Sequence, residues 1–369
     1  MANSTTTSWV GMDTSADKIQ VAIYRGDERT PGRELEVGAD ARGRGRLRAE
    51  LGKEAGIVKC VYEAGPCGYQ LYRELNANGY FCQVIAPSLI PHKPGEKVKT
   101  NRLDARRLAS LNRAGELTPV RVPDIAQEAL RSIVRARDDV RRDLQRSRQR
   151  LNGFFLHHGC RYNETTPWTR KHWAWIKALR MEDENLKMVL EESIKSIESK
   201  IEQLQRFDDR IEQIAQRPEY KSKVAAYGVL KGFKTLGAMT VLAEAGDLRA
   251  YAKAGQFMGS TGMVPKENST GAAQRRGSIT KTGNPYLRRI LIEAAWSYQK
   301  RVYVGATIER RRKGQPEPLV AIARKADHRL HGKFSKLLFR YNKRPTVAVV
   351  AVARELAGFV WAIGQQIEG

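Results

Sequence analysis

Residues 9–25 read WVGMDTSADKIQVAIYR, and this stretch decides how the chain begins to fold. Residues 9–13 are a short apolar run that ends in a carboxylate. In residues 18–25, apolar side chains recur at every second position, the period of a strand with one buried face; they are Ile19, Val21 and Ile23. The stretch therefore predicts a hairpin of two strands at the start of a sheet.

Strand and helix patterns alternate over residues 9–115. After the hairpin we expect, in chain order, a strand at 34–37, a helix at 44–54, a strand at 57–63, a helix at 69–76, a strand at 81–86 and a helix from 101. The order strand, strand, strand, helix, strand, helix, strand, helix is typical of a mixed α/β sheet.

Length and charge limit the class of protein. The 369 residues suffice for roughly two to three domains. The 65 Lys and Arg residues exceed the 40 Asp and Glu residues, so the net charge is +25 and a polyanionic partner, foremost nucleic acid, is indicated. A membrane partner is not expected, because the most apolar segment, 346–364, carries Arg354 and Glu355 at its middle.

The positive charge is uneven along the chain. Residues 221–369 hold 27 basic and 9 acidic side chains, net +18, which leaves +7 for residues 1–220. Each cation that neutralises a phosphate releases counterions, so the C-terminal part is the stronger candidate for phosphate binding. Eight arginines also lie within 131–150, and we expect them either on a solvated helix face or on a nucleic acid.

The cysteines and the first residues indicate a reducing compartment. The four cysteines show no C-x-x-C spacing, so we expect free thiols and neither a disulfide framework nor a zinc ribbon. The polar residues 1–8 lack the features of a secretory signal. A cytoplasmic location, at the nucleoid, is therefore expected.

Residues 124–215 predict a pair of long helices. Asp124 with Gln127 resembles a capping box, and the helical pattern that follows runs to about residue 156. A tryptophan-rich loop comes next. A heptad seam then follows with one polar position, and its residues are Leu190, Ile194, Ile197, Ile201, Leu204, Asp208 and Ile211. We interpret this region as an antiparallel helical arm for oligomerisation; a hairpin closed within one chain is the alternative.

Three carboxylates occupy positions at which acids can meet. Asp13 ends the first strand, Glu63 ends a later strand, and Asp104 lies on the core-facing stripe of a helix over the sheet. Oxygen ligands suit divalent cations, and such ions stabilise the attacking and leaving oxygens of a phosphodiester. We favour a metal site over three unrelated strand-end or capping residues.

A hydroxyl lies among cations and glycines near the C-terminal helices. Residues 260–281 read as a loop, and Ser269 within it is followed by Gly271, Arg275 and Arg276. Serine becomes a nucleophile only when its proton is removed and the developing charge is stabilised. By itself this pattern is that of a turn serine.

Taken together, these residues resemble a family. The chain is similar to transposases of the insertion-sequence 110 family, including its 1111 subgroup. The resemblance covers nearly the whole length, and its motifs are VGMD at 10–13, YEAG at 62–65, VKTNRLDARRLA at 98–109, GMVP at 262–265, STG at 269–271, ITKTGN at 279–284 and LRR at 287–289. Each motif alone is loose, but their order is specific.

The resemblance implies three domains. They are an α/β, RNase H-like (RuvC-like) DEDD domain at 1–120, a helical coiled-coil arm at 121–220 and a mainly α C-terminal transposase domain at 221–369. By the family pattern, Asp13, Glu63 and Asp104 bind Mg²⁺. The expected third acid of that pattern is Asn101 here, an amide that could coordinate a metal only weakly.

The resemblance also implies a mechanism and partners. Ser269 would attack a DNA phosphate to form a 5′-phosphoserine link, with serine and metal site contributed by different subunits. Thr270, the next residue, leaves the identity of the hydroxyl open. The partners would be donor and target DNA, a structured bridge RNA that pairs with both, and further copies of the chain in a homo-oligomer, a dimer of dimers.

Three other functions fit parts of the sequence. A RuvC-like junction nuclease would use metal and water alone, with Ser269 structural. A nucleic-acid-binding scaffold without catalysis is suggested by Asn101. An ATP-dependent kinase-like fold also begins with an apolar-Gly-apolar-Asp strand, but no second glycine-rich phosphate loop follows, and a sugar kinase has no need of a +25 charge.

Overall fold

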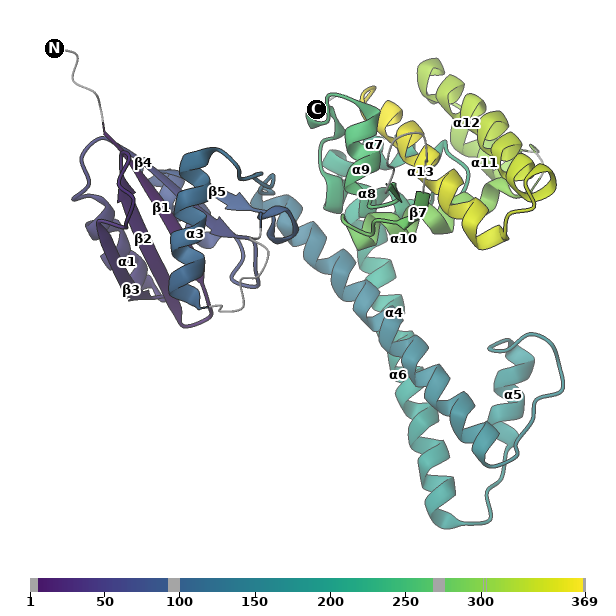
Figure 1. The fold of residues 1–369 in the computed structure, drawn as a ribbon. Coiled ribbons are helices and arrows are strands. Elements are labelled where there is room, and N and C mark those ends of the chain that lie inside the picture. Colours follow the sequence, from purple (N-terminus) through teal and green to yellow (C-terminus); the bar gives the residue numbers. More distant parts are fainter. Residues whose placement is uncertain (1–5, 92–99, 268–275, 301, 303, 368–369) are drawn as a thin grey trace. The chain divides into compact units, whose positions relative to one another are not determined.

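The structure is a computed structural model that describes residues 6–91, 100–267, 276–300, 302 and 304–367. The chain divides into two compact units, Met1–Val122 and Pro123–Gly369, each with its own hydrophobic core. The first unit contains a mixed sheet with helices, and the second is mostly helical (Figure 1). This agrees with the α/β and mainly α parts expected from the sequence.

Five strands form the sheet of the first unit, in the order β3-β2-β1-β4-β5. β1 and β2 pair antiparallel, as do β2 and β3, so the predicted hairpin is confirmed. β1 pairs parallel with β4, and β4 with β5. The elements are β1 (Thr7–Thr14), β2 (Lys18–Arg25), β3 (Arg33–Gly38), α1 (Ala41–Leu51), β4 (Ile57–Glu63), α2 (Gln70–Ala77), β5 (Phe81–Ile85), η1 (Pro87–Leu89) and α3 (Asn101–Ala114).

Helices cover both faces of this sheet. α1 packs on β3 and α2 on β5, whereas α3 packs on β1, β2 and β4. Val10 and Met12 of β1 lie in the core that includes α1 and α2, while Trp9 packs with Ala105 and Ala109 of α3. β1 is therefore covered on both sides, which explains its nearly continuous apolar sequence.

Gly11 allows α3 to approach β1 closely. A Cβ atom at this position would lie 2.1 Å from the Ala105 carbonyl oxygen and 2.4 Å from the Ala109 nitrogen. No side chain fits in that space, so only glycine permits this contact between helix and strand.

The four cysteines are free thiols, as the sequence predicts. Cys60 of β4 and Cys82 of β5 are register partners in the sheet, and both are buried. Burial raises the pKa of the Cys82 thiol to about 12. These two residues therefore act as small core side chains.

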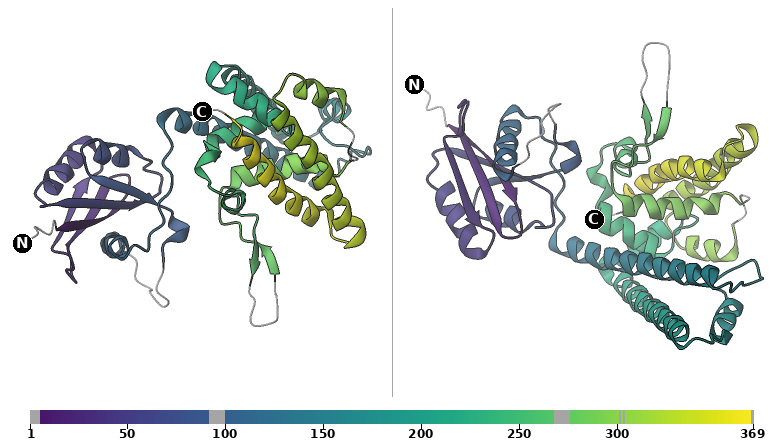
Figure 2. Two further views of the ribbon diagram at one scale, coloured as in Figure 1. Left: turned by 90° about the horizontal axis from the view of Figure 1, so that it is seen from above. Right: turned by 60° about the horizontal axis from the view of Figure 1, so that its bottom comes forward.

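Two long helices, α4 (Ile125–His157) and α6 (Glu184–Ala215), pack along each other in the second unit (Figure 2). The predicted heptad seam of α6 faces α4, since Leu190 and Ile197 share a core cluster with Leu144 and Leu151. The seam is thus used within one chain. Its role in oligomerisation stays a prediction.

Polar contacts fix the start of α4 and its pairing with α6. Asp124 Oδ1 accepts a hydrogen bond from the Gln127 backbone N–H at 2.7 Å, which confirms the predicted helix start. The Gln127 side chain donates to the Ala243 carbonyl at 3.1 Å. Asp208, the polar position of the seam, accepts two hydrogen bonds from Arg137 at 2.8 and 3.1 Å.

α13 (Pro345–Gly364) lies at the centre of the second core, with Val352, Leu356 and Val360 fully buried. By length and composition it could cross a membrane, but half of its most apolar window is buried inside the protein. The other helices of this unit are α5 (Arg170–Ala178), α7 (Pro218–Gly228), α8 (Thr235–Ala245), α9 (Ala254–Ser260), α10 (Pro285–Ala295), α11 (Ala306–Arg312) and α12 (Glu317–Ser335), with short helices η2 (Leu248–Ala250), η3 (Trp296–Tyr298) and η4 (Lys336–Arg340).

Two segments predicted to be loops contain regular structure. α5 carries Trp173 and Trp175 of the tryptophan-rich segment. Within 260–281, β6 (Pro265–Glu267) and β7 (Arg276–Ile279) pair as a short antiparallel ribbon. The ribbon was missed because its polar, glycine-rich sequence has no alternating apolar pattern, while strand pairing needs only backbone hydrogen bonds.

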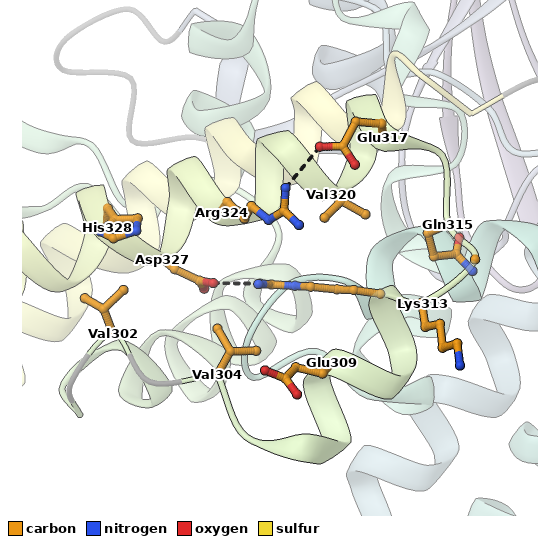
Figure 3. Close-up of a pocket in the computed structure, with 12 residues that line it drawn as sticks. Val302, Val304, Glu309, Lys313, Gln315, Glu317, Val320, Arg324, Asp327 and His328 are labelled. Atoms are coloured by element: carbon orange, nitrogen blue, oxygen red, sulfur yellow. Dashed lines mark hydrogen bonds and ion pairs between the residues drawn. The ribbon is translucent and has the colours of Figure 1, made fainter.

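A buried ion pair joins α11 to α12. Arg312 Nη2 lies 2.8 Å from Asp327 Oδ2, and their side chains are 8% and 2% exposed. Arg312 Nε also donates to the Val229 carbonyl at 2.9 Å. Asp327 lines a cavity of about 560 Å³, in which Glu317 and Arg324 form a second, exposed pair (Figure 3).

We expect Asp327→Asn to lower the free energy of unfolding of the second unit by about 3–5 kcal/mol, because Arg312 would be left as a buried charge without its counterion. Denaturant unfolding followed by circular dichroism measures this. The control is Glu317→Gln, which breaks the exposed pair and should cost under about 1 kcal/mol. Equal effects of the two variants would contradict the importance of the buried pair.

Candidate active site

Asp13 and Glu63 lie at the ends of two neighbouring parallel strands. Asp13 is the next-to-last residue of β1, and Glu63 is the last of β4. The register pairs Met12 with Tyr62, so Asp13 and Glu63 each follow one residue later. Because paired strands lie about 4.8 Å apart, the two acids leave the sheet as neighbours.

Both carboxylates belong to the face of the sheet that α3 covers. Residues two positions apart on a strand share a face. Gly11, two before Asp13, touches the backbone of α3, and Val61, two before Glu63, packs with Leu108 of α3. Asp13 and Glu63 are half-buried, so they remain accessible from solvent.

α3 carries Asp104 to the same face. Asp104 is half-buried and directly precedes Ala105, the residue that contacts Gly11. Asn101, the residue at the place of the expected third acid, is the first residue of the helix and is exposed. The helix begins there because Thr100 caps it, its Oγ1 accepting from the Leu103 N–H at 3.3 Å.

The candidate metal ligands are the carboxylates of Asp13, Glu63 and Asp104. Among the residues that the structure describes, no three His, Cys, Asp or Glu side chains cluster closely enough to enclose one. Two neighbouring carboxylates nevertheless favour a cation between them. Mg²⁺ is commonly held by one or two carboxylates together with water and substrate phosphate oxygens. Asp13 and Glu63 therefore fit a hard divalent ion shared with a phosphate, whereas the described side chains do not gather Asp104 with them into a three-acid cluster.

Glu34 of β3 fixes the first turn of α3. It accepts hydrogen bonds from Arg106 at 2.5 and 2.7 Å and from Arg102 Nε at 2.9 Å. The hydrogen bonds from Arg106 and Arg102 lower the pKa of Glu34 to about 2. The two arginines bracket Asp104 in the sequence, so Glu34 holds the turn that presents this acid.

Sequence reasoning missed Glu34. Its partners lie 68 and 72 positions away, and no local pattern reports such a pairing. The one available signal was the spacing of Arg102 and Arg106, which puts them on one side of the helix.

Ser269, with Thr270, Gly271 and Arg275, lies outside the described residues. The described flanks of this segment are β6 and β7. Backbone hydrogen bonds tie the two flanks together, from Thr280 N to the Val264 carbonyl at 2.8 Å, from Lys281 N to Gly262 at 3.0 Å and from Asn284 N to Ser260 at 2.8 Å.

Asn284 links the base of the ribbon to two other helices. Its Oδ1 accepts from the Tyr286 and Leu287 N–H groups at 2.9 and 3.1 Å, which caps α10. Its Nδ2 donates to Glu244 of α8 at 2.6 Å. The Glu244 carboxylate, fully buried, also accepts from Arg135 of α4 at 2.7 and 2.8 Å. α4, α8 and α10 thus meet at one carboxylate.

The arginine-rich stretch 131–150 is therefore not a simple solvated face. Asp138 is buried and pairs with Arg141 and Arg142 of the same helix and with Arg289 of α10 at 3.1 Å. Arg135 pairs with Glu244, as described above. Many arginines of α4 form ion pairs with acids within the second unit. Fewer of these cations therefore remain for an external polyanion.

Two family models match the chain. One, described as "Transposase IS116/IS110/IS902 family", matches residues 229–308. The other, a transposase model for the DEDD domain of the IS110 type, matches residues 10–158. The second match includes all three acids and Asn101.

Several known proteins are similar over most of the length. "Putative transposase y4qE" of Sinorhizobium fredii is 37% identical over 97% of this chain and 89% of the relative. The transposase for insertion sequence element IS1533 of Leptospira borgpetersenii is 33% identical, covering 89% of this chain and 96% of the relative. The transposase for IS1111A of Coxiella burnetii is 25% identical, covering 73% and 75%.

We expect Glu34→Gln to speed amide hydrogen exchange in the first turn of α3 about fivefold at pH 7, because the turn loses its charged anchor. The folded pKa of Glu34 lies below its ordinary value of 4.5. The stabilisation is thus complete above about pH 4.5 and is lost as pH falls toward 2. The difference between variant and wild type should shrink over that range.

The matched control is Glu36→Gln on the same strand, whose carboxylate forms an exposed pair with Lys18 at 2.7 Å. This variant should leave the exchange of α3 unchanged. Unaltered exchange in Glu34→Gln would show that the anchor does not hold the turn.

Proposed function

This chain belongs to the IS116/IS110/IS902 family of transposases, and from that premise we propose how it breaks and rejoins DNA. As a transposase it is a DNA-processing enzyme that catalyses strand transfer. The proposal assigns a RuvC-like DEDD domain to 1–120, a coiled-coil arm to 121–220 and a transposase domain to 221–369. It describes a guided recombinase with a serine nucleophile.

The placement of three acids on one face of the sheet carries the metal part of the proposal. Asp13, Glu63 and Asp104 would hold Mg²⁺, with Asn101 as a doubtful fourth ligand. The ion would stabilise negative charge on phosphate oxygens. Glu34 keeps the helix turn of Asp104 in place through its two arginines. The donor chemistry supports a divalent metal, of which Mg²⁺ is the proposed one.

Ser269 would supply the nucleophile. Its Oγ would form a bond to the DNA phosphorus while the bond from phosphorus to the 3′ oxygen breaks. The serine proton leaves to solvent or a base, and the departing 3′ oxygen takes up a proton. The phosphate then stays on the 5′ end as a phosphoserine. A 3′ hydroxyl of another strand can reverse the step, so rejoining needs no external energy source.

The proposed partners are nucleic acids and further copies of the chain. A structured bridge RNA would pair with donor and target DNA, and serine and metal site would come from different subunits of a dimer of dimers. The net charge of +18 over residues 221–369 supports binding of several nucleic acid segments. If pairing to RNA selects the DNA, few base contacts by the protein are needed.

A metal-dependent nuclease without a covalent intermediate is the second candidate. It needs only a water molecule as nucleophile and the acids that the structure describes, Asp13, Glu63 and Asp104. It differs from the first candidate in having no need of Ser269.

We expect Ser269→Ala to abolish strand transfer and the covalent protein–DNA adduct, because no other group would attack the phosphorus. A 3′-labelled substrate on a denaturing gel detects both, because the fragment that carries the 5′-phosphoserine keeps the 3′ label. The control is Ser278→Ala, an exposed serine on β7, which should retain activity. Cleavage that survives in Ser269→Ala would establish the nuclease. Thr270→Val tests the neighbouring hydroxyl.

The metal assignment has a readout besides activity. We expect Mg²⁺ to raise the Tm of Ser269→Ala in the presence of DNA, because the acids bind the ion in the folded state only. Asp13→Asn in the same background should remove this shift, whereas Asp17→Asn, on the exposed turn after β1, should keep it. A shift that persists in Asp13→Asn would place the metal elsewhere.

We expect the full chain, purified from its host without nuclease, to carry one discrete structured RNA. Sequencing of the bound RNA checks this. Random fragments alone would favour an unguided nuclease or a scaffold, because a general basic surface binds RNA without selecting a species.

A further inference from the structure

α12 and α13 pack along each other in the second unit (Figure 1). A basic groove lies between them. It consists of two adjoining hollows of about 550 and 390 Å³. Arg329, Lys333 and Glu355 line both hollows, so they form one continuous groove. None of the sites described above uses it.

The cations of this groove form a stripe. Lys325, Arg329, Lys333 and Lys336 follow one another at steps of four, four and three, so they share one side of α12 and the turn after it. Arg354 adds a further cation from α13. Glu355 is the single carboxylate among the described residues that line the groove, so these residues have a clear positive excess.

Glu355 organises the stripe without neutralising it. It is hydrogen-bonded to Arg329 and, at 2.7 Å, to Lys333, and its side chain is 16% exposed. Burial alone would raise its pKa, but the hydrogen bonds from Lys333 and Arg329 outweigh burial and lower the pKa. One negative charge thus holds two cations at fixed positions, an arrangement suited to a chain of phosphates.

One aromatic side chain lines the end of the groove, and a second lies two residues before it in the sequence. Tyr341 lines it and is 50% exposed, with Lys336 and Arg340 near its ring at 5.7 and 5.9 Å. Phe339, on the π-helical turn η4 that continues the stripe, is 86% exposed, the most exposed of the described aromatic side chains. π-helical turns are rare and occur often at functional sites.

This combination selects one partner chemistry. Phosphates account for the cations, and unpaired bases account for the exposed rings, because the bases of a duplex are stacked inside it. Strand transfer cleaves DNA and leaves strand ends that must stay bound until they are rejoined. We propose that the α12–α13 groove holds single-stranded DNA during strand transfer, with phosphates on the stripe and bases on Phe339 and Tyr341.

The inference rests on strand-transfer activity and does not depend on Ser269 or the metal. The test is therefore equilibrium binding of fluorescent oligo-dT to the full chain in EDTA, where no cleavage occurs. Failure of the serine proposal would leave this measurement unaffected.

We expect Lys325→Gln with Lys336→Gln to weaken oligo-dT binding about tenfold and to lower the slope of log K against log salt by about 1.4, the value for two phosphate contacts to a single strand. Phe339→Ala with Tyr341→Ala should weaken oligo-dT about tenfold and leave duplex binding unchanged. The charge-matched control is Lys187→Gln with Lys195→Gln on α6, which should bind as wild type.

A second measurement locates the strand directly. Oligo-dT carrying 5-bromodeoxyuridine should photocrosslink to the peptide that contains residues 339–341. Crosslinks only elsewhere would overturn the proposal. So would an α6 control that loses as much oligo-dT affinity as the groove lysine variant, or an aromatic variant that loses duplex and oligo-dT affinity equally. Preferential loss of oligo-rU binding would identify an RNA site. Competition by polyglutamate as strong as that by unlabelled oligo-dT would identify an acidic protein partner.

Discussion

The contact of Gly11 with the backbone of α3 is the constraint on which the first unit depends. Because no Cβ fits between Gly11 and Ala105, the helix lies directly on the central strand. Asp104 immediately precedes Ala105 at this contact, and Asp13 lies two residues after Gly11 on β1. Glu34 then anchors the first turn of α3 from the third strand. A candidate metal site thus follows from one close approach and one ion pair.

In the second unit, a buried carboxylate joins the helices in the way that the Gly11 contact joins strand and helix in the first unit. Glu244 binds Arg135 of α4 and Asn284 at the start of α10, while Asn284 also closes the base of the β6–β7 ribbon. α4 and the base of the ribbon are therefore joined through a single buried group.

The cations of the second unit fall into two groups, those paired with acids of the protein and those left in excess at a surface groove. Many arginines of α4 are paired with acids of the second unit, so the high density of positive charge at 131–150 is largely internal. The α12–α13 groove differs, since its cations outnumber its one described carboxylate and border the exposed ring of Tyr341. A net charge of +25 therefore indicates a polyanionic partner without indicating where it binds.

Local patterns in the sequence determined most helices and strands, the hairpin, the start of α4 at Asp124 and the heptad seam, because hydrophobic period and capping act between near neighbours. They also indicated Asp13, Glu63 and Asp104. Only the tertiary structure decided that these acids share one face, that Asn101 is exposed, that polar residues pair as a ribbon, and that Glu34 and Glu244 hold distant arginines. These features depend on strand register and on contacts between residues far apart in the chain, which no local period encodes.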